Sequence, residues 1–133
     1  MKNKNILVLG GNGFLGKNFV NKFKKNNKIS VVYLKEFKKK NNDNIKNIKL
    51  NLCNYNDFKR KLSLNFDFIV NFSGYVNHAS LKDAGMKVIE NHLLTLFNLI
   101  EYYKDSKYLK KFLHIVSSDE YGDKLSPQSE NIR

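Results

Sequence analysis

Gly10-Gly11-Asn12-Gly13-Phe14-Leu15-Gly16 lies between two segments of different hydrophobic periodicity, and this position makes it the stretch that decides the fold. The residues before it, Ile6-Leu7-Val8-Leu9, form a continuous apolar run that indicates a buried strand. Apolar residues from its end onward recur at helical spacing: Phe14, Leu15, Phe19, Val20 and Phe23. A strand, a glycine-rich turn and a helix N-terminus together predict a site for the pyrophosphate of a dinucleotide. Glycines let the backbone approach the phosphates, and free N–H groups and the helix dipole stabilise the negative charge.

A glycine turn can also serve only as a connection between a strand and a helix. That interpretation explains Gly10, but it does not explain why positions 13 and 16 are glycine as well. We therefore predict a cofactor-binding turn, whose residues are Gly10, Asn12, Gly13, Phe14, Leu15 and Gly16.

The length and composition are those of one globular domain, residues 1–133, with enough chain to bury a core. The sequence has no apolar run of about eighteen residues, and its polar start is followed at once by a strand, so we expect neither a membrane span nor a signal peptide. The single Cys53 excludes an internal disulfide and suits a cytoplasmic location. Three separated histidines without cysteine or acidic partners do not predict a metal site.

The formal net charge of +12 raises the question of nucleic-acid binding. The cations are almost all lysines scattered among asparagines, and Arg60 and Arg133 are the two arginines. Planar arginine forks, which read phosphates and bases well, are therefore nearly missing. We expect no nucleic-acid partner and interpret the dense cluster Lys38-Lys39-Lys40 as a solvated loop.

Apolar runs alternate with helical patterns along the whole chain. The predicted strands are 5–10, 29–35, 47–51, 66–72 and 112–116, and the predicted helices are 14–26, 55–64 and 80–104. Strands that alternate with helices predict an α/β fold, a doubly wound Rossmann-type parallel sheet of about five strands with right-handed crossovers.

Five further strings stand in a fixed order along the chain. They are Asn51-Leu52-Cys53-Asn54, Phe68-Ile69-Val70-Asn71-Phe72-Ser73-Gly74, Asn91-His92-Leu93-Leu94-Thr95, Val116-Ser117-Ser118-Asp119-Glu120-Tyr121-Gly122 and Ser126-Pro127-Gln128-Ser129-Glu130. With the glycine turn, they make the chain resemble the extended short-chain dehydrogenase/reductases, the NAD-dependent epimerase/dehydratase group that modifies nucleotide sugars. The corresponding family patterns are D-L-x-D, V-x-H-L-A-A, N-V-x-G-T, S-S-x-E-Y-G and P-x-x-E.

The resemblance implies that Asn51, Leu52, Ser73, Gly74 and Asn91 also contact an NAD or NADP cofactor. Asn51 stands where the family has aspartate, but an amide can still accept from adenine N6 and donate to N1.

The segment after the second predicted strand bears on the choice between the two cofactors. Glu36 lies twenty residues after Gly16, the spacing at which an acidic residue reaches the ribose 2′-hydroxyl. Lys35 and Lys38 would instead suit the 2′-phosphate of NADP, and all three are also consistent with plain loop charges.

The resemblance further implies that Ser118 hydrogen-bonds the sugar hydroxyl that is oxidised. Asp119 and Glu120 resemble the acid–base pair of sugar dehydratases, or they are exposed loop charges. The family's catalytic Tyr-x-x-x-Lys is expected beyond Ser118, and the chain contains none there. Tyr55 with Lys59 and Tyr103 with Lys107 have this spacing, but both pairs precede the serines and we interpret them as coincidences.

We therefore expect the N-terminal cofactor-binding part of an NAD(P)-dependent nucleotide-sugar epimerase, dehydratase or reductase, which acts by hydride transfer at the sugar. The chain would end before the catalytic Tyr/Lys helix and the substrate domain, so that its last strand and long helix expose apolar surface. The resemblance implies a homodimer through helix 80–104. The alternative is a non-catalytic dinucleotide-binding module that acts as a sensor or partner subunit.

Overall fold

The structure is a computed structural model that describes residues 2–34, 44–74, 81–117 and 122. Five strands form one sheet in the order β3-β2-β1-β4-β5, and each neighbouring pair is parallel. The strands are β1 (Asn5–Leu9), β2 (Lys28–Tyr33), β3 (Ile45–Lys49), β4 (Phe68–Asn71) and β5 (Lys111–His114). The predicted doubly wound parallel sheet is confirmed. Its third strand begins two residues earlier than predicted, because Ile45 already pairs with Ile29 of β2.

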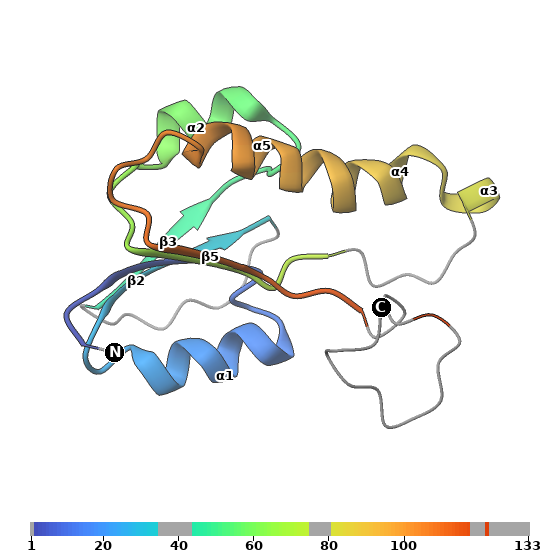
Figure 1. The fold of residues 1–133 in the computed structure, drawn as a ribbon. Coiled ribbons are helices and arrows are strands. Elements are labelled where there is room, and N and C mark those ends of the chain that lie inside the picture. Colours follow the sequence, from blue (N-terminus) through green and yellow to red (C-terminus); the bar gives the residue numbers. More distant parts are fainter. Residues whose placement is uncertain (1, 35–43, 75–80, 118–121, 123–133) are drawn as a thin grey trace.

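Helices cover both faces of this sheet (Figure 1). Helix α1 (Phe14–Phe23) lies on one face, and α2 (Tyr55–Lys61) and α5 (Thr95–Tyr103) lie on the other. The chain first winds outward from β1 to β3 and then returns to place β4 on the other side of β1. The winding direction therefore reverses between β1 and β4, and in open α/β sheets ligands bind at the carboxyl ends of the strands at such a reversal.

The alternation of side chains along β1 builds two cores, one on each face. Leu7 and Leu9 join the larger core with Phe58 of α2 and Leu99 of α5, and all four are fully buried. Ile6 and Val8 face the other way and join the smaller core, which includes Val20 of α1. Because both faces are covered, β1 is apolar from Ile6 to Leu9, as its sequence predicted.

The prediction of one continuous helix over 80–104 is wrong. The described residues form α3 (Leu81–Ala84), α4 (Met86–Ile89), a π-helical segment η1 (Glu90–Leu94) and α5. Gly85 separates α3 from α4 with a φ of 45°, a positive value that glycine adopts readily and that interrupts a right-handed helix. The π-helical turns then widen the helix before α5 begins.

Many apolar side chains of this region face outward. Leu99 and Tyr103 of α5 pack on the sheet, whereas Phe97 is 67% exposed and Met86 is 64% exposed. At the end of β5, Leu113 and Val116 are also exposed. The described part of the chain therefore carries the exposed apolar surface that the sequence predicted. None of its helices has the length and apolar character needed to cross a membrane.

Candidate functional site

A cleft of about 510 Å³ lies at the carboxyl ends of the strands, where the winding direction reverses. Segments that follow β1, β2, β3 and β4 line it, together with η1 and the start of α5. Of the predicted cofactor residues, the structure brings together in this lining Gly10, Asn12, Gly13, Asn51, Leu52, Ser73, Gly74 and Asn91. Sequence reasoning missed the apolar part of the lining, which is Val32, Leu34, Leu50 and Phe72.

Other predicted site residues lie elsewhere. Phe14 and Leu15 are exposed at the first turn of α1, outside the residues that line the cleft. Gly16 is buried beneath the glycine turn. Lys35 and Glu36 fall outside the described residues, as do Ser118, Asp119 and Glu120.

Two glycines of the turn are required by packing within the protein. Gly10 has a φ of 69°, and a Cβ atom there would lie 2.8 Å from the carbonyl group of Phe72 and from the nitrogen of Ser73. A Cβ atom on Gly16 would collide with the carbonyl oxygen of Gly10 and lie 2.6 Å from the Cα atom of Gly11. These glycines therefore let the end of β1 approach both the end of β4 and the start of α1.

Gly13 differs from Gly10 and Gly16. It is the N-cap of α1, with φ −70° and ψ 173°, an extended conformation that any residue can adopt. A Cβ atom there would have one neighbour within 4 Å among the described atoms, the carbonyl oxygen of Gly10 at 3.3 Å. Gly13 lines the cleft at a helix N-terminus, where first-turn N–H groups lack helical partners. Its missing side chain leaves room for an anion at these donors.

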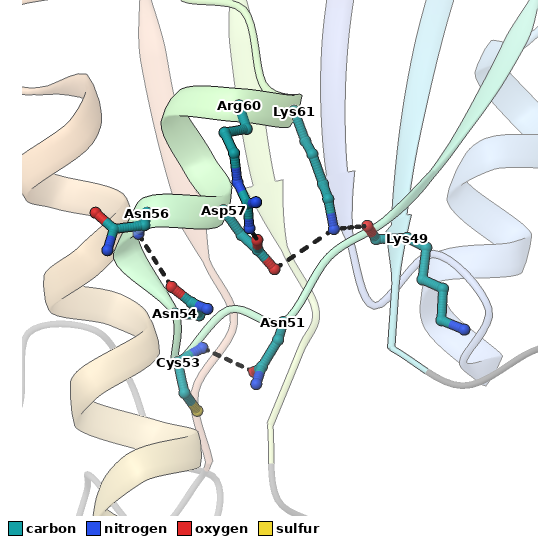
Figure 2. A network of polar contacts seen from close by, with 8 residues as sticks. All are labelled: Lys49, Asn51, Cys53, Asn54, Asn56, Asp57, Arg60 and Lys61. Atoms are coloured by element: carbon teal, nitrogen blue, oxygen red, sulfur yellow. Dashed lines mark hydrogen bonds and ion pairs between the residues drawn. The ribbon is translucent and has the colours of Figure 1, made fainter.

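Hydrogen bonds hold the loop that follows β3 in shape (Figure 2). The Asn51 side-chain oxygen accepts from the N–H of Cys53 at 3.1 Å, and that of Asn54 caps α2 by accepting from the N–H of Asn56 at 3.1 Å. The buried Asn98 of α5 donates to the carbonyl oxygen of Leu52 at 2.8 Å. Sequence reasoning missed Asn98, although a polar residue among apolar helix positions could have indicated its role.

A second polar group in Figure 2 fastens α2 to β3. Asp57 pairs with Arg60 and with Lys61, and Lys61 also donates to the carbonyl oxygen of Lys49 at 3.1 Å. The hydrogen bond from Arg60, together with the charge of Lys61, lowers the pKa of Asp57. These residues lie outside the lining of the cleft, so their role is to hold the helix beside it.

The ends of β4 and β5 are joined by a polar network beside the glycine turn. Asn71, which is 1% exposed, accepts from the Ser73 N–H at 2.9 Å and from the Ser73 hydroxyl. The Asn71 amide nitrogen lies 3.1 Å from Nδ1 of His114 and donates to it. Sequence reasoning placed Ser73 in the site but missed Asn71 and His114, although a polar residue that ends a buried strand was a usable signal.

Asn91 reaches the cleft from η1. Its side chain donates to the carbonyl oxygen of Lys87 at 2.6 Å, and its own carbonyl oxygen accepts from the Thr95 hydroxyl at 2.9 Å. The Cys53 thiol donates to the carbonyl oxygen of Glu90 at 3.7 Å, and burial raises the pKa of this thiol. The loop after β3 is thus attached to η1 as well as to α5.

The remaining predictions concern catalysis and metals. Tyr103 is buried, and its hydroxyl donates to the carbonyl oxygen of Ser63 at 3.0 Å. Burial also raises its pKa, so Tyr103 is a structural residue rather than a general base. Lys59 lies over the Tyr55 ring at 5.4 Å on the outer helix α2. Among the described residues, histidine, cysteine, aspartate and glutamate form no group of three that could hold a metal ion.

Known proteins resemble this chain in fold. WbmF of Bordetella bronchiseptica, solved in complex with NAD+, is 23% identical with a TM-score of 0.78, and the match covers 98% of this chain and 41% of that one. UDP-N-acetylglucosamine 4-epimerase of Methanobrevibacter ruminantium M1, in complex with UDP-N-acetylmuramic acid, is 24% identical with a TM-score of 0.75, covering 98% and 44%. A UDP-galactose 4-epimerase is 21% identical with a TM-score of 0.77, covering 96% and 43%.

The chain therefore spans about two-fifths of the length of these solved structures. A comparison with the sequences of curated proteins gives no match. The family model described as "NAD dependent epimerase/dehydratase family" matches residues 6–133. The expected nicotinamide cofactor is thereby confirmed at the level of the family, and with a match over nearly the whole sequence the chain belongs to the NAD-dependent epimerase/dehydratase family.

Proposed function

We propose that this chain holds NAD in the cleft, as the N-terminal cofactor-binding part of an enzyme that modifies nucleotide sugars. The observation that carries the proposal is Gly13, a glycine that its own backbone conformation does not require, at the helix N-terminus that borders the cleft. A bound pyrophosphate would explain the glycine at position 13, because it would accept hydrogen bonds from the first turn of α1 and occupy the space of a side chain.

The order of the strands suggests how the two ends of the dinucleotide lie along the sheet. With the pyrophosphate beside Gly13 at the end of β1, one end of the dinucleotide extends over β2 and β3 and the other over β4. The apolar residues Val32, Leu34 and Leu50 provide a slot for a planar base on the β2–β3 side. The nicotinamide then lies toward Ser73, on the side from which the chain continues to Ser118.

The chemistry of the whole enzyme is proposed from the family. Hydride transfer between the sugar and the nicotinamide would use Ser118 to orient the sugar hydroxyl, with Asp119 and Glu120 as acid and base in a dehydratase. The Methanobrevibacter ruminantium relative was solved with a UDP-sugar, which supports a nucleotide sugar as substrate. We further propose a cytoplasmic location, where the free Cys53 remains reduced.

We also propose that the chain forms a homodimer through the outward side of α4, η1 and α5. Met86, Leu93, Phe97 and Ile100 recur there at helical spacing and are each at least half exposed. The same side of a second copy would cover them in an isologous interface.

Cofactor binding is tested by thermal unfolding with and without NAD+, NADH, NADP+ and NADPH. A ligand that binds the folded chain raises the melting temperature, and the four dinucleotides separate NAD from NADP use. Gly13→Asp should abolish this rise, because its carboxylate would repel and displace the pyrophosphate. The free protein should keep its stability, since aspartate is a favourable N-cap residue.

Asn21→Asp is the matched control, because it places the same charge on α1 outside the lining of the cleft. It should keep the temperature rise. A folded wild-type chain whose melting temperature no dinucleotide changes would contradict the proposed cofactor site.

A further inference from the structure

The wall of the cleft beside the glycine turn is formed by the chain at Phe72 and Ser73, both of which line the cleft. The main chain here lies directly against Gly10, since a Cβ atom on that glycine would approach the Phe72 carbonyl group and the Ser73 nitrogen to 2.8 Å. A shift of Ser73 would therefore change both the shape of the cleft and the packing of the glycine turn. The inference below concerns what holds this wall, and it rests on the cofactor function proposed above.

The Asn71 side chain makes the bend by which the chain leaves β4 and enters the wall. Its Oδ1 atom accepts from the Ser73 N–H at 2.9 Å and from the Ser73 hydroxyl. A side-chain oxygen that bonds the backbone two residues further on is the pattern of an Asx turn. Because a backbone N–H can only donate, the oxygen of the amide has to face Ser73, and its nitrogen Nδ2 has to point away from it.

His114 is the partner of that nitrogen. Asn71 and His114 stand opposite each other in the neighbouring parallel strands β4 and β5. Nδ2 of Asn71 lies 3.1 Å from Nδ1 of His114, and because Nδ2 is a donor, Nδ1 has to be the acceptor. The contact therefore requires an imidazole that carries no hydrogen on Nδ1. Phe112 stacks with this ring along β5, at a centroid distance of 6.5 Å.

The Asn71 amide is deeply buried, so its bond to His114 is not easily replaced by water. Asn71 is 1% exposed, and no buried side-chain nitrogen or oxygen lacks a partner in the part of the chain that the structure describes. Removing the acceptor at position 114 would leave Nδ2 without a partner, which costs more than the bond itself contributed. The amide would then turn to regain a partner and give up its hold on Ser73.

We propose that His114 is a positioning residue of the cofactor site, which acts through Asn71 to hold Ser73 and the cleft wall in place for the dinucleotide. His114 lies outside the lining of the cleft, so its effect on binding needs no contact with the ligand. The glycine turn and the edge strand β5 are thereby connected by one chain of contacts, from Gly10 to Ser73, Asn71 and His114.

The test measures NAD+ binding by isothermal titration calorimetry on the full 133-residue chain. His114→Leu removes the acceptor and should raise the Kd for NAD+ by about fivefold to tenfold, the effect of roughly one hydrogen bond. His114→Asn has nearly the shape of leucine but returns an oxygen acceptor close to the place of Nδ1. It should restore most of the affinity, which a role in packing alone would not explain.

Ile69→Val is the control for lost stability, because Ile69 is fully buried in β4 and makes no contribution to the lining of the cleft. It should lower the melting temperature of the free protein and leave the Kd unchanged. His114→Phe keeps a ring beside Phe112 and also lacks the acceptor. It should show the same loss of affinity as the leucine variant, and it keeps the test valid if that variant folds poorly.

NMR of the imidazole nitrogens in the free protein examines the contact without a ligand, with His114→Asn identifying the signals. The neutral ring of His114 should carry its hydrogen on Nε2, and a hydrogen on Nδ1 would overturn the inference. A folded His114→Leu or His114→Phe variant that binds NAD+ as tightly as the wild type would overturn the inference alone. Failure of the wild type to bind NAD+ would instead contradict the proposed cofactor site, and with it the role of His114 there.

Discussion

At the scale of single residues, Gly10, Gly13 and Gly16 of the turn have separable roles. Gly16→Ala should destabilise the protein by about 1–3 kcal/mol, the usual cost of an added group that forces backbone apart. The colliding atoms are backbone atoms of Gly10 and Gly11, which cannot rotate away as the end of a side chain would. Gly13→Ala should have a much smaller effect, since its added carbon has more room. Urea unfolding of both variants measures the difference, and equal losses would contradict it.

The sequence could identify this turn but could not separate these roles. The spacing of Gly10, Gly13 and Gly16 between a predicted strand and a predicted helix indicates a phosphate-binding turn. Which of them is needed by the protein depends on the carbonyl group of Phe72, 62 residues after Gly10, and on how close β4 lies to β1. For the same reason the Asn71–His114 contact could not be predicted, because it joins two strands that become neighbours only in the folded sheet.

At the scale of elements, one carboxylate connects the amino ends of three neighbouring strands. Asp67, just before β4, accepts from the N–H of Asn5 in β1 at 3.0 Å and pairs at 3.0 Å with Lys110, which precedes β5. The hydrogen bond from Asn5, followed by the contact with Lys110, lowers the pKa of Asp67 in the folded state. The ionised form of Asp67 is therefore favoured by folding.

The lowered pKa of Asp67 determines how its contribution to stability changes with pH. The folded-state pKa lies below the unfolded value of about 4, so the stabilisation is fully present above that pH and is lost as the pH falls through the folded value. Asp67→Asn should be less stable than the wild type at pH 7, and the gap should narrow below pH 4. Chemical unfolding at several pH values measures it, with Asp105→Asn at an exposed position as the control. A gap that stays constant with pH would contradict the role of this charge.

The region 80–104 shows what hydrophobic periodicity can and cannot predict about an element. The apolar residues at helical spacing correctly indicated a helical region. They did not indicate the interruption at Gly85 or the π-helical turns of η1. They also did not tell which side faces the sheet, because the region has apolar residues on two sides. Leu99 and Tyr103 face the sheet, and Phe97 and Ile100 face outward. A second apolar side is typical of a helix that packs against two partners.

At the scale of the whole molecule, the exposed apolar side of α4, η1 and α5 and the large net charge have opposite effects on association. An exposed apolar surface favours association, whereas a formal net charge of +12 makes two copies repel each other. Salt screens the repulsion over about 10 Å at 0.1 M and leaves the apolar contact intact. The proposed homodimer should therefore become more populated as the salt concentration rises. A nucleic-acid complex held by the lysines would respond in the opposite direction.

Phe97→Asp tests this balance at its most exposed position, because it removes the largest apolar side chain of the surface and places two like charges in a symmetric interface. Light scattering coupled to size-exclusion chromatography should give the mass of a dimer for the wild type at high salt and 15.5 kDa for the variant. Tyr108→Asp is the matched control, since Tyr108 is 58% exposed but lies beyond the end of α5. Equal masses for the two variants would show that α5 is not the interface. The face would then have to be covered by something other than a second copy of itself.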